Sequence, residues 1–319
     1  RIIYENPSTS ISLKRSLGVL VVDVDVVLGG SASLYLAEKI SRLLGAEFSP
    51  LVVRNFPDGE TYVRIPVDVD GRRVALVQSM YRHPNEYLME FVLAAKSLKE
   101  LGATRVVGVI PYFPYTRQDS RFKPGEAISA RIVAELVEWA GVDSLITVDM
   151  HLHRFKSPSE LFKVKVVNLS ASGLLARAAV KKFNLNDVVV VGPDEEAEQW
   201  ASVAAKEIGA EHAILTKERI GDEEVRVTGG VDVSGRDALL VDDIVSTGGT
   251  LAEAAKHLLS MGARSVYAVC THGILVSGAE RKLYEAGISG FLFSDSVPSP
   301  YSEVSVAPII AEALRGEKE

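Results

Sequence analysis

The sequence predicts an α/β protein with two similar, doubly wound domains, each built on a mostly parallel central sheet. Short β-branched runs alternate with longer segments of helical period from Asp23 onward, which is typical of parallel sheets covered by helices on both faces. Residues 94–109 also recur at 254–269, with eight identical residues and a constant offset of 160 in a chain of 319. We interpret this repeat as an internal duplication rather than as two unrelated helix–glycine–strand units.

The expected strands are short apolar runs bounded by turn residues. They lie at residues 24–28, 73–78, 106–110, 145–148, 188–191, 238–241, 266–269 and 290–293. Ser31 or Ser33 is expected to cap a first helix that ends near Leu44. Further helices are expected at residues 86–101, 128–140, 195–208 and 251–261. Ligands bind beyond the carboxyl ends of the strands in such sheets, so the residues just after the strands are candidates for a site.

The domain boundaries follow from these runs. Residues 2–16 show no periodicity, and we expect residues 1–22 to be an N-terminal extension outside the fold. Residues 23–168 are expected to form the N-terminal α/β domain and residues 169–304 the C-terminal α/β domain. A last helix is expected over residues 305–315.

The composition excludes several classes of protein. Apolar residues make up 47 % and charged residues 24 % of the chain, close to the averages for globular proteins. The net charge of −7 argues against a nucleic-acid binder, and no apolar stretch approaches the length of a membrane span. Cys270 is the only cysteine, so no intramolecular disulfide can form, and a reducing, cytoplasmic location is expected.

The most informative segment is residues 239–250, where an apolar strand is followed by two acids and a short loop before a helix. The pair Gly248–Gly249 allows backbone N–H groups to approach an anion, and the helix N-terminus adds its positive dipole end. Hydroxyl donors come from Ser246, Thr247 and Thr250. The segment therefore predicts a phosphate site. The acids Asp242 and Asp243 suit sugar hydroxyls, a magnesium ion or both, and the alternative is a solvated turn.

This segment resembles the phosphoribosyl-binding loop shared by type I phosphoribosyltransferases and phosphoribosyl pyrophosphate synthetases. Four other segments fall in the order and spacing of the synthetases: residues 55–60 (NFPDGE), 113–119 (FPYTRQD), 148–151 (VDMH) and 216–219 (TKER). The resemblance to the ribose-phosphate pyrophosphokinase family covers residues 26–313. It implies two domains of the type I phosphoribosyltransferase kind, a C-terminal helix that packs on the first domain, and a homo-oligomer.

The resemblance also implies a reaction. Members of this family transfer the diphosphoryl group of ATP to the anomeric hydroxyl of ribose 5-phosphate for nucleotide biosynthesis, giving phosphoribosyl pyrophosphate and AMP, and they use Mg²⁺. By analogy, the phosphate of ribose 5-phosphate binds residues 246–250, and its 2- and 3-hydroxyls bind Asp242 and Asp243. The first domain binds ATP through Phe56, Asp58, Glu60, Arg117 and Gln118, with Phe56 stacked on the adenine.

The remaining implied roles concern the metal and the reacting phosphates. His151 and Asp194 each follow an expected strand. The resemblance implies that His151 contacts the magnesium or the ATP phosphates and that Asp194 lies near the metal and the ribose. A structural histidine is the alternative for His151. Glu195 and Glu196 depart from the small residues usual in the family, which affects the expected ribose pocket. Lys217 and Arg219 are the implied catalytic cations of a loop that closes over the phosphates, and an exposed hairpin is the alternative.

Two other functions are compatible with part of the pattern. A phosphoribosyltransferase would explain the acidic pair and its loop, but not the duplication or the segments around Phe56 and Arg117. A non-catalytic, synthetase-like regulatory subunit is expected to lose the loop cations or the acidic pair, and this chain keeps both. No residue is an obvious strong general base.

Overall fold

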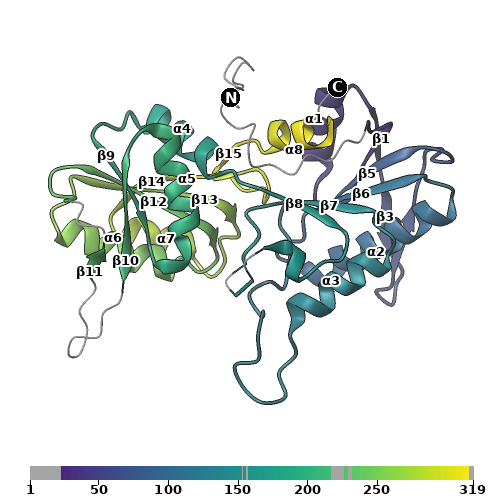
Figure 1. Ribbon diagram of the computed structural model, residues 1–319, viewed down its shortest axis with the longest axis horizontal. Coiled ribbons are helices and arrows are strands. Elements are labelled where there is room, and N and C mark those ends of the chain that lie inside the picture. Colours follow the sequence, from purple (N-terminus) through teal and green to yellow (C-terminus); the bar gives the residue numbers. More distant parts are fainter. Residues whose placement is uncertain (1–22, 153, 156, 217–225, 229–231, 316–319) are drawn as a thin grey trace. The chain divides into compact units, whose positions relative to one another are not determined.

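A computed structural model describes residues 23–152, 154–155, 157–216, 226–228 and 232–315 (Figure 1). The described chain divides into two compact units. Residues 23–169 together with residues 305–315 form the first unit, and residues 170–304 form the second unit.

The first unit contains a six-stranded sheet in the order β2-β1-β5-β6-β7-β8, and every neighbouring pair is parallel. Its strands are β1 (Val26–Gly29), β2 (Glu47–Pro50), β5 (Arg73–Val77), β6 (Arg105–Val109), β7 (Ser144–Val148) and β8 (Lys165–Leu169). A separate antiparallel hairpin is formed by β3 (Val52–Asn55) and β4 (Thr61–Arg64). The helices are α1 (Leu34–Leu44), α2 (Pro84–Glu100), α3 (Ser129–Trp139), the 3₁₀ turn η1 (Pro158–Glu160) and α8 (Ala307–Arg315).

The second unit contains a seven-stranded sheet in the order β11-β10-β9-β12-β13-β14-β15, in which only the β10–β11 pair is antiparallel among the described strands. Its strands are β9 (Val188–Gly192), β10 (Glu211–Thr216), β11 (Arg226–Thr228), β12 (Asp237–Val245), β13 (Ser265–Gly273), β14 (Ile288–Ser294) and β15 (Ser302–Val304). The helices are α4 (Ser172–Phe183), the 3₁₀ turn η2 (Glu195–Ala197), α5 (Glu198–Ile208), α6 (Gly249–Ser260) and α7 (Ala279–Glu285).

The two units repeat the same topology, because the order β2-β1-β5-β6-β7-β8 matches β10-β9-β12-β13-β14-β15. The corner between helix and strand is also repeated in detail. Gly102 and Gly262 both have a positive φ, of 87° and 90°. Each accepts a hydrogen bond at its carbonyl oxygen, from the N–H of Gly71 at 3.0 Å and of Gly235 at 2.8 Å respectively. The predicted fold class is therefore confirmed.

The last helix of the chain belongs to the first unit, although the strand before it belongs to the second. α8 follows β15 of the second unit and packs on α1 in the first (Figure 1). In the second unit, α4 packs on α5. The two packings are equivalent, because α1 follows β1 and α5 follows η2 after β9, the matching strand.

The structure corrects several expected elements. The strand expected at residues 238–241 continues to Val245, so Asp242 and Asp243 lie within β12 and not after it. Ser33 occupies the N-cap position of α1, but its hydroxyl accepts a hydrogen bond from the N–H of Ser79 at 2.8 Å instead of capping the helix. The helix expected from Glu195 begins with η2. The elements β2, β3, β4, β8, β10, β11, β15, α4 and α7 were not predicted.

The core of each unit lies between its sheet and the covering helices. Phe91 and Leu76 are fully buried in the first unit, and Phe291 and Phe293 are buried in the second. Among the described residues, no helix combines the length and the apolar character needed to cross a membrane. Each sheet is covered on its faces, so its carboxyl edge is where side chains are free to meet a ligand.

Candidate active site

The first candidate surface lies in the second unit, where β12 leads into α6. Gly248, at the N-cap position of α6, has a φ of 72°, and a Cβ there would meet Cδ2 of Leu283 at 3.2 Å. Both the backbone conformation and the packing of α7 therefore require glycine. The N–H of Val276 donates to the carbonyl oxygen of Ser246 at 3.0 Å, which braces the turn.

The N-terminus of α6 has open backbone donors. No side chain caps the Gly248 position in the described part of the chain, and a Cβ on Gly249 would meet only Oγ1 of Thr247, at 3.9 Å. Thr247 and Thr250 are exposed, and Ser246 is half-buried. The predicted loop residues 246–250 therefore lie on one turn, with uncapped N–H groups and hydroxyls beside a helix N-terminus, which suits an anion.

The acidic pair adjoins this turn. Asp243 is buried, Asp242 is partly buried, and the N–H of Asp243 donates to Oδ1 of Asp242 at 2.9 Å. Burial, and then the charges of Asp243 and Asp194, raise the pKa of Asp242 well above its ordinary value. The three predicted acids are thus close enough to repel one another, although Asp194 comes from the end of a different strand. Such a cluster favours a cation or hydroxyl donors.

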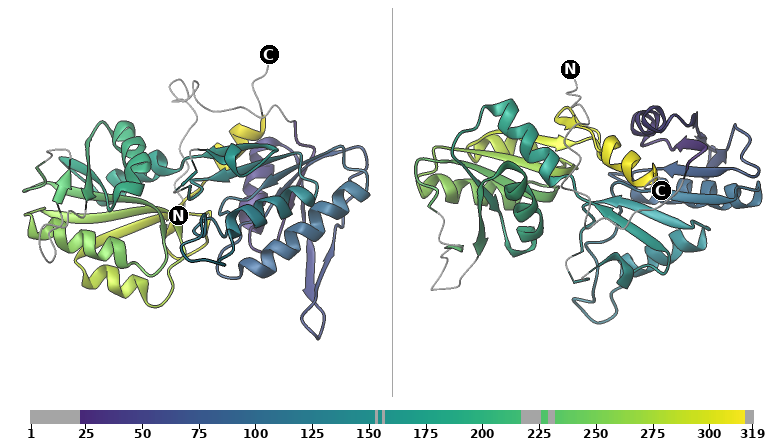
Figure 2. Two further views of the ribbon diagram at one scale, coloured as in Figure 1. Left: turned by 60° about the horizontal axis from the view of Figure 1, so that its bottom comes forward. Right: turned by 45° about the horizontal axis from the view of Figure 1, so that its top comes forward.

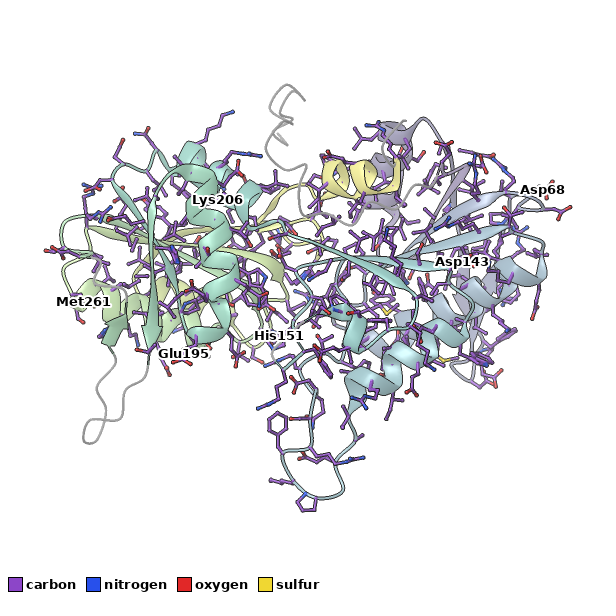
Figure 3. All side chains as sticks on the ribbon, in the orientation of Figure 1. Asp68, Asp143, His151, Glu195, Lys206 and Met261 are labelled. Atoms are coloured by element: carbon purple, nitrogen blue, oxygen red, sulfur yellow. The ribbon has the colours of Figure 1, made fainter. Side chains whose placement is uncertain are left out.

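Asp194 also has a structural role that the sequence analysis did not assign. Its Oδ1 atom accepts hydrogen bonds from the N–H groups of Glu196 at 3.1 Å and Ala197 at 3.3 Å, which caps η2. Glu195 and Glu196 are exposed, and Figure 3 labels Glu195. One oxygen of Asp194 is therefore used by the backbone, and its other oxygen is the one available for a ligand.

The second candidate surface lies in the first unit, on the long loop between β6 and α3 that extends away from the sheet (Figure 1). The side-chain amide of Gln118 donates to the carbonyl oxygen of Ser120 at 3.0 Å and to Oε2 of Glu126 at 3.3 Å. The same Glu126 oxygen accepts from the N–H groups of Phe122 at 2.8 Å and Lys123 at 3.0 Å. Glu126 thus holds the loop from within, and Arg117 is exposed beside it.

Strained backbone marks the carboxyl edge of this sheet. Arg82, Tyr115 and Asp149 have φ values of 58°, 64° and 38°, and they follow β5, β6 and β7, three neighbouring strands. Residues other than glycine rarely adopt this conformation, and where they do the strain often coincides with a functional site. Asp149 is buried, and its N–H donates to the carbonyl oxygen of Leu169 at 2.7 Å.

His151 follows Asp149 at this edge and is half-buried; Figure 3 labels it. The N–H of the intervening Met150 donates to Oδ1 of Asn168 at 3.0 Å. The structure therefore brings Arg117, Gln118 and His151 to the loops after the adjacent strands β6 and β7.

The other ATP candidates lie elsewhere in the first unit, at the tip of the β3–β4 hairpin, which projects from the unit (Figure 2, left). Phe56 is 40 % exposed, and Asp58 and Glu60 are exposed. The Phe56 ring packs edge-on against Tyr62, with ring centroids 6.0 Å apart, and the Arg54 guanidinium lies 4.9 Å from the Phe56 centroid. Within the described residues, no hydrogen bond or ion pair joins this tip to Arg117 or Gln118.

The predicted catalytic residues Lys217 and Arg219 lie outside the described residues.

The structure also reveals two residues that the sequence analysis gave no role. Asp119 closes the motif at residues 113–119, so the motif itself was a signal, whereas nothing in the sequence singled out Arg154. The two form an ion pair with 2.8 Å between Oδ1 and Nη1.

Comparisons with known proteins identify the family of the chain. Residues 26–141 match a family model described as the N-terminal domain of ribose phosphate pyrophosphokinase, and residues 169–288 match one described as a phosphoribosyl transferase domain. A ribose-phosphate pyrophosphokinase of Methanopyrus kandleri is 40 % identical over 91 % of this chain and 98 % of its own length. The corresponding protein of Methanothermobacter thermautotrophicus is 42 % identical over 91 % of this chain and all of its own.

A solved structure extends the likeness to three dimensions. The phosphoribosylpyrophosphate synthetase of Mycobacterium smegmatis superimposes with a TM-score of 0.80 at 32 % identity, covering 91 % of this chain and 98 % of that one. The fold and the loop after β12 thus define an enzyme with duplicated domains of the phosphoribosyltransferase type. More narrowly, the chain belongs to the ribose-phosphate pyrophosphokinase family, the diphosphoryl transferases predicted from the motifs, and a phosphoribosyltransferase is not favoured.

Proposed function

We propose that the chain transfers the β,γ-diphosphoryl group of ATP to the anomeric hydroxyl of ribose 5-phosphate, giving phosphoribosyl pyrophosphate and AMP. The observation that carries the proposal is the uncapped turn at residues 246–250 directly beside the acids Asp242 and Asp243. A sugar phosphate needs both an anion site and hydroxyl acceptors, and this turn supplies both within one strand–helix junction. Family membership over nine-tenths of the chain supports the same reaction.

In this proposal, ribose 5-phosphate binds the second unit. Its phosphate accepts hydrogen bonds from the first N–H groups of α6 and from the hydroxyls of Ser246, Thr247 and Thr250. Its 2- and 3-hydroxyls donate to Asp242 and Asp243. Gly249 lets the phosphate approach the backbone, because the space where its Cβ would stand is open except for Oγ1 of Thr247 at 3.9 Å, whereas Gly248 is required by its positive φ and by Leu283.

ATP is proposed to bind the first unit. Arg117 and Gln118 bind its phosphates from the loop after β6. Phe56 offers an exposed aromatic face for the adenine, and Asp58 and Glu60 accept hydrogen bonds from the nucleoside. The hairpin tip makes no hydrogen bond or ion pair with Arg117 in the described part of the chain, so the hairpin's part in ATP binding stays a prediction.

Mg²⁺ is the proposed metal, and the donor set fits it. Burial, and then the charges of Asp243 and Asp194, raise the pKa of Asp242, so a bound cation would stabilise its charged form, and carboxylate oxygens are preferred ligands of magnesium. No group of three acidic, histidine or cysteine side chains is arranged to hold a metal alone in the described residues. Magnesium usually binds one or two carboxylates together with substrate phosphates, so Asp194, and His151 from the first unit, are proposed as contacts to the metal or its phosphates.

The proposed chemistry is a direct displacement. The anomeric oxygen of ribose 5-phosphate forms a bond to the β-phosphorus as the bond from that phosphorus to the α–β bridging oxygen breaks. AMP leaves with the bridging oxygen, and the hydroxyl proton passes to solvent. Bound Mg²⁺ would neutralise charge on the phosphates. The chain itself orients the sugar through residues 242–250, and Lys217 and Arg219 are proposed to neutralise the migrating group.

One assay separates this proposal from its alternatives. The protein is incubated with ATP and Mg²⁺, with and without ribose 5-phosphate, and AMP is measured. AMP that forms only with the sugar phosphate supports the proposal. A phosphoribosyltransferase does not use ATP and ribose 5-phosphate as its two substrates, so it would form no AMP in this assay. A regulatory subunit without catalytic activity would form none either. The absence of AMP under these conditions would therefore overturn the proposal.

Two further proposals concern assembly and location. We propose a homo-oligomer, as the family resemblance implies, which light scattering of the purified protein would test. The single, buried thiol of Cys270 fits a reducing compartment, and we propose the cytoplasm.

A further inference from the structure

An ion pair joins two loops at the carboxyl edge of the first unit. Asp119 lies on the loop after β6, directly after Arg117 and Gln118, and Arg154 lies on the loop after β7, three residues beyond His151. The two strands are neighbours in the sheet. The pair therefore spans the two loops that carry three of the proposed ATP and metal contacts.

The contact uses several groups. Oδ1 of Asp119 accepts from Nη1 of Arg154 at 2.8 Å, and Oδ2 accepts from the backbone N–H of the same arginine at 3.1 Å. Nη1 also donates to Oγ of Ser120 at 3.1 Å. The Phe122 ring lies 4.8 Å from the guanidinium carbon, at cation–π distance. Three residues within a run of four on one loop, Asp119, Ser120 and Phe122, thus hold one residue of the other loop.

Burial makes this pair different from a surface ion pair. The Asp119 side chain is 2 % exposed, and that of Arg154 is 44 % exposed. A buried carboxylate that loses its cation is left uncompensated, so the two loops are strongly held in one spacing. Exposed ion pairs, in contrast, contribute little.

We propose that Asp119 and Arg154 are a positioning pair for ATP, which fix the distance between the Arg117–Gln118 segment and His151. Neither residue touches substrate in this proposal, which rests on the proposed function of the site. Small displacements of positioning groups can reduce catalysis about a hundredfold. Loss of the pair is therefore expected to weaken ATP binding and turnover without affecting the ribose 5-phosphate site in the second unit.

The same sheet offers a control with the same bonding pattern at its opposite edge, where the Asp143 side chain is 38 % exposed. Oδ2 of Asp143, just before β7, accepts from Nζ of Lys99 and from the backbone N–H of Val106, both at 2.6 Å. Asp143, labelled in Figure 3, thus also joins a cation and a backbone N–H across β6 and β7. Loss of this pair removes a similar contact far from the loops that follow the strands.

The experiment compares Asp119→Asn, Arg154→Met, Arg154→Lys and the Asp119→Asn/Arg154→Met double variant with Asp143→Asn and Lys99→Met. The KM values for ATP and ribose 5-phosphate, kcat, the Kd of ADP by calorimetry and the melting temperature are measured. We expect the Asp119 and Arg154 variants to raise the KM for ATP and the Kd of ADP about tenfold, or about 1.4 kcal/mol, with the KM for ribose 5-phosphate within twofold. The double variant should be no worse than either single variant, and Arg154→Lys should lie between.

The control variants Asp143→Asn and Lys99→Met should change the melting temperature. They should change neither the KM for ATP nor the Kd of ADP. Equal shifts of both KM values, or the same nucleotide effect from Asp143→Asn, would show that the pair is merely structural and overturn the proposal. Arg154→Met removes a half-exposed group, so it remains informative if Asp119→Asn does not fold. If the unmodified protein makes no AMP, the proposed function fails, whereas the ADP calorimetry still decides whether the pair positions a nucleotide.

Discussion

Asp237, at the start of β12, forms an ion pair with Arg264, the residue before β13, with 2.8 Å between Oδ2 and Nη2. The hydrogen bond from Arg264 lowers the pKa of Asp237 to about 2, against a desolvation effect in the other direction. The first unit has a comparable pair between a different pair of strands: Asp25, before β1, pairs with Arg73 at the start of β5 at 2.8 Å, and the hydrogen bond from Arg73 lowers the pKa of Asp25 to about 2. Both units therefore place a charged clamp at the amino edge of the sheet, opposite the candidate site.

The clamp predicts how stability depends on pH. The folded-state pKa of Asp237 lies below its unfolded value of 3.8, so its contribution is fully present above pH 3.8 and is lost as the pH falls toward 2. Asp237→Asn is expected to melt several degrees lower than the unmodified protein at pH 7, with the difference shrinking below pH 4. Melting curves against pH test this. Asp68→Asn, at an exposed residue labelled in Figure 3, is the control. A difference in melting temperature between Asp237→Asn and the unmodified protein that is as large at pH 2 as at pH 7 would contradict the prediction.

Gly248 tests the anion site. Gly248→Ala forces a side chain into the left-handed region, at a cost of about 1–3 kcal/mol, and against Leu283. We expect the KM for ribose 5-phosphate to rise about tenfold, or about 1.4 kcal/mol, because the turn must shift. Gly209→Ala is the matched control, since Gly209 also has a positive φ, of 66°, but its Cβ would meet nothing within 4 Å. An equal KM change in both variants would show that strain alone, and not the turn, is responsible.

Asp242 tests the acidic cluster. Burial, and then repulsion by Asp243 and Asp194, raise the pKa of this carboxyl. Asp242→Asn removes the buried charge and its repulsion, so we expect a higher melting temperature in the absence of metal. Activity should fall about tenfold to a hundredfold, because a hydrogen bond to a charged acceptor is lost. This opposition of stability and activity is common at functional sites. A variant that melts lower and keeps its activity would contradict both parts of the prediction.

The fold was predictable where local pattern and tertiary packing agree. Central strands such as β5, β6 and β12 are buried on both faces, so they appear as continuous apolar runs. β2, in which only Ser49 of four residues is buried, and β15, with three half-buried residues, lie at the edges of their sheets and have no such run. The β3–β4 hairpin forms its own sheet, and its turn was recognised by motif and not by periodicity.

The candidate site was predictable only in part for a related reason. The turn at residues 246–250 is local, so its glycines and hydroxyls could be identified from one stretch of sequence. The pair of Asp119 and Arg154 joins residues 35 positions apart, and the proximity of Asp194 to Asp242 depends on the order of β9 and β12 in the sheet. Such contacts depend on which strands are neighbours in the sheet, and no local pattern around either residue of a pair identifies its partner.

Lys217 tests the loop cations. Lys217→Ala should lower kcat about a hundredfold or more, as loss of one group that stabilises transition-state charge typically does. The Kd of ribose 5-phosphate should change little, because that sugar phosphate is proposed to bind residues 242–250. Single-turnover kinetics with calorimetry separate the two quantities. Near-normal turnover would remove the proposed role of Lys217.

Phe56 tests whether the hairpin binds the base. A base stacked on an aromatic ring is worth about 1–3 kcal/mol by substitution, so Phe56→Leu should raise the KM for ATP about tenfold if the adenine stacks there. Folding should be nearly unaffected, because the residue is 40 % exposed and its ring packs against Tyr62 and Arg54, two neighbours on the same hairpin.

Tyr35→Leu, at an aromatic residue of α1 that is 83 % exposed, is the matched control for loss of a surface ring. The KM for ATP should be unchanged in this variant. Because the hairpin tip makes no hydrogen bond or ion pair with Arg117 or Gln118 among the described residues, an unchanged KM in Phe56→Leu would assign ATP binding to the loops after β6 and β7 alone. A tenfold rise confined to Phe56→Leu would instead require that the hairpin tip reaches the nucleotide in the working enzyme.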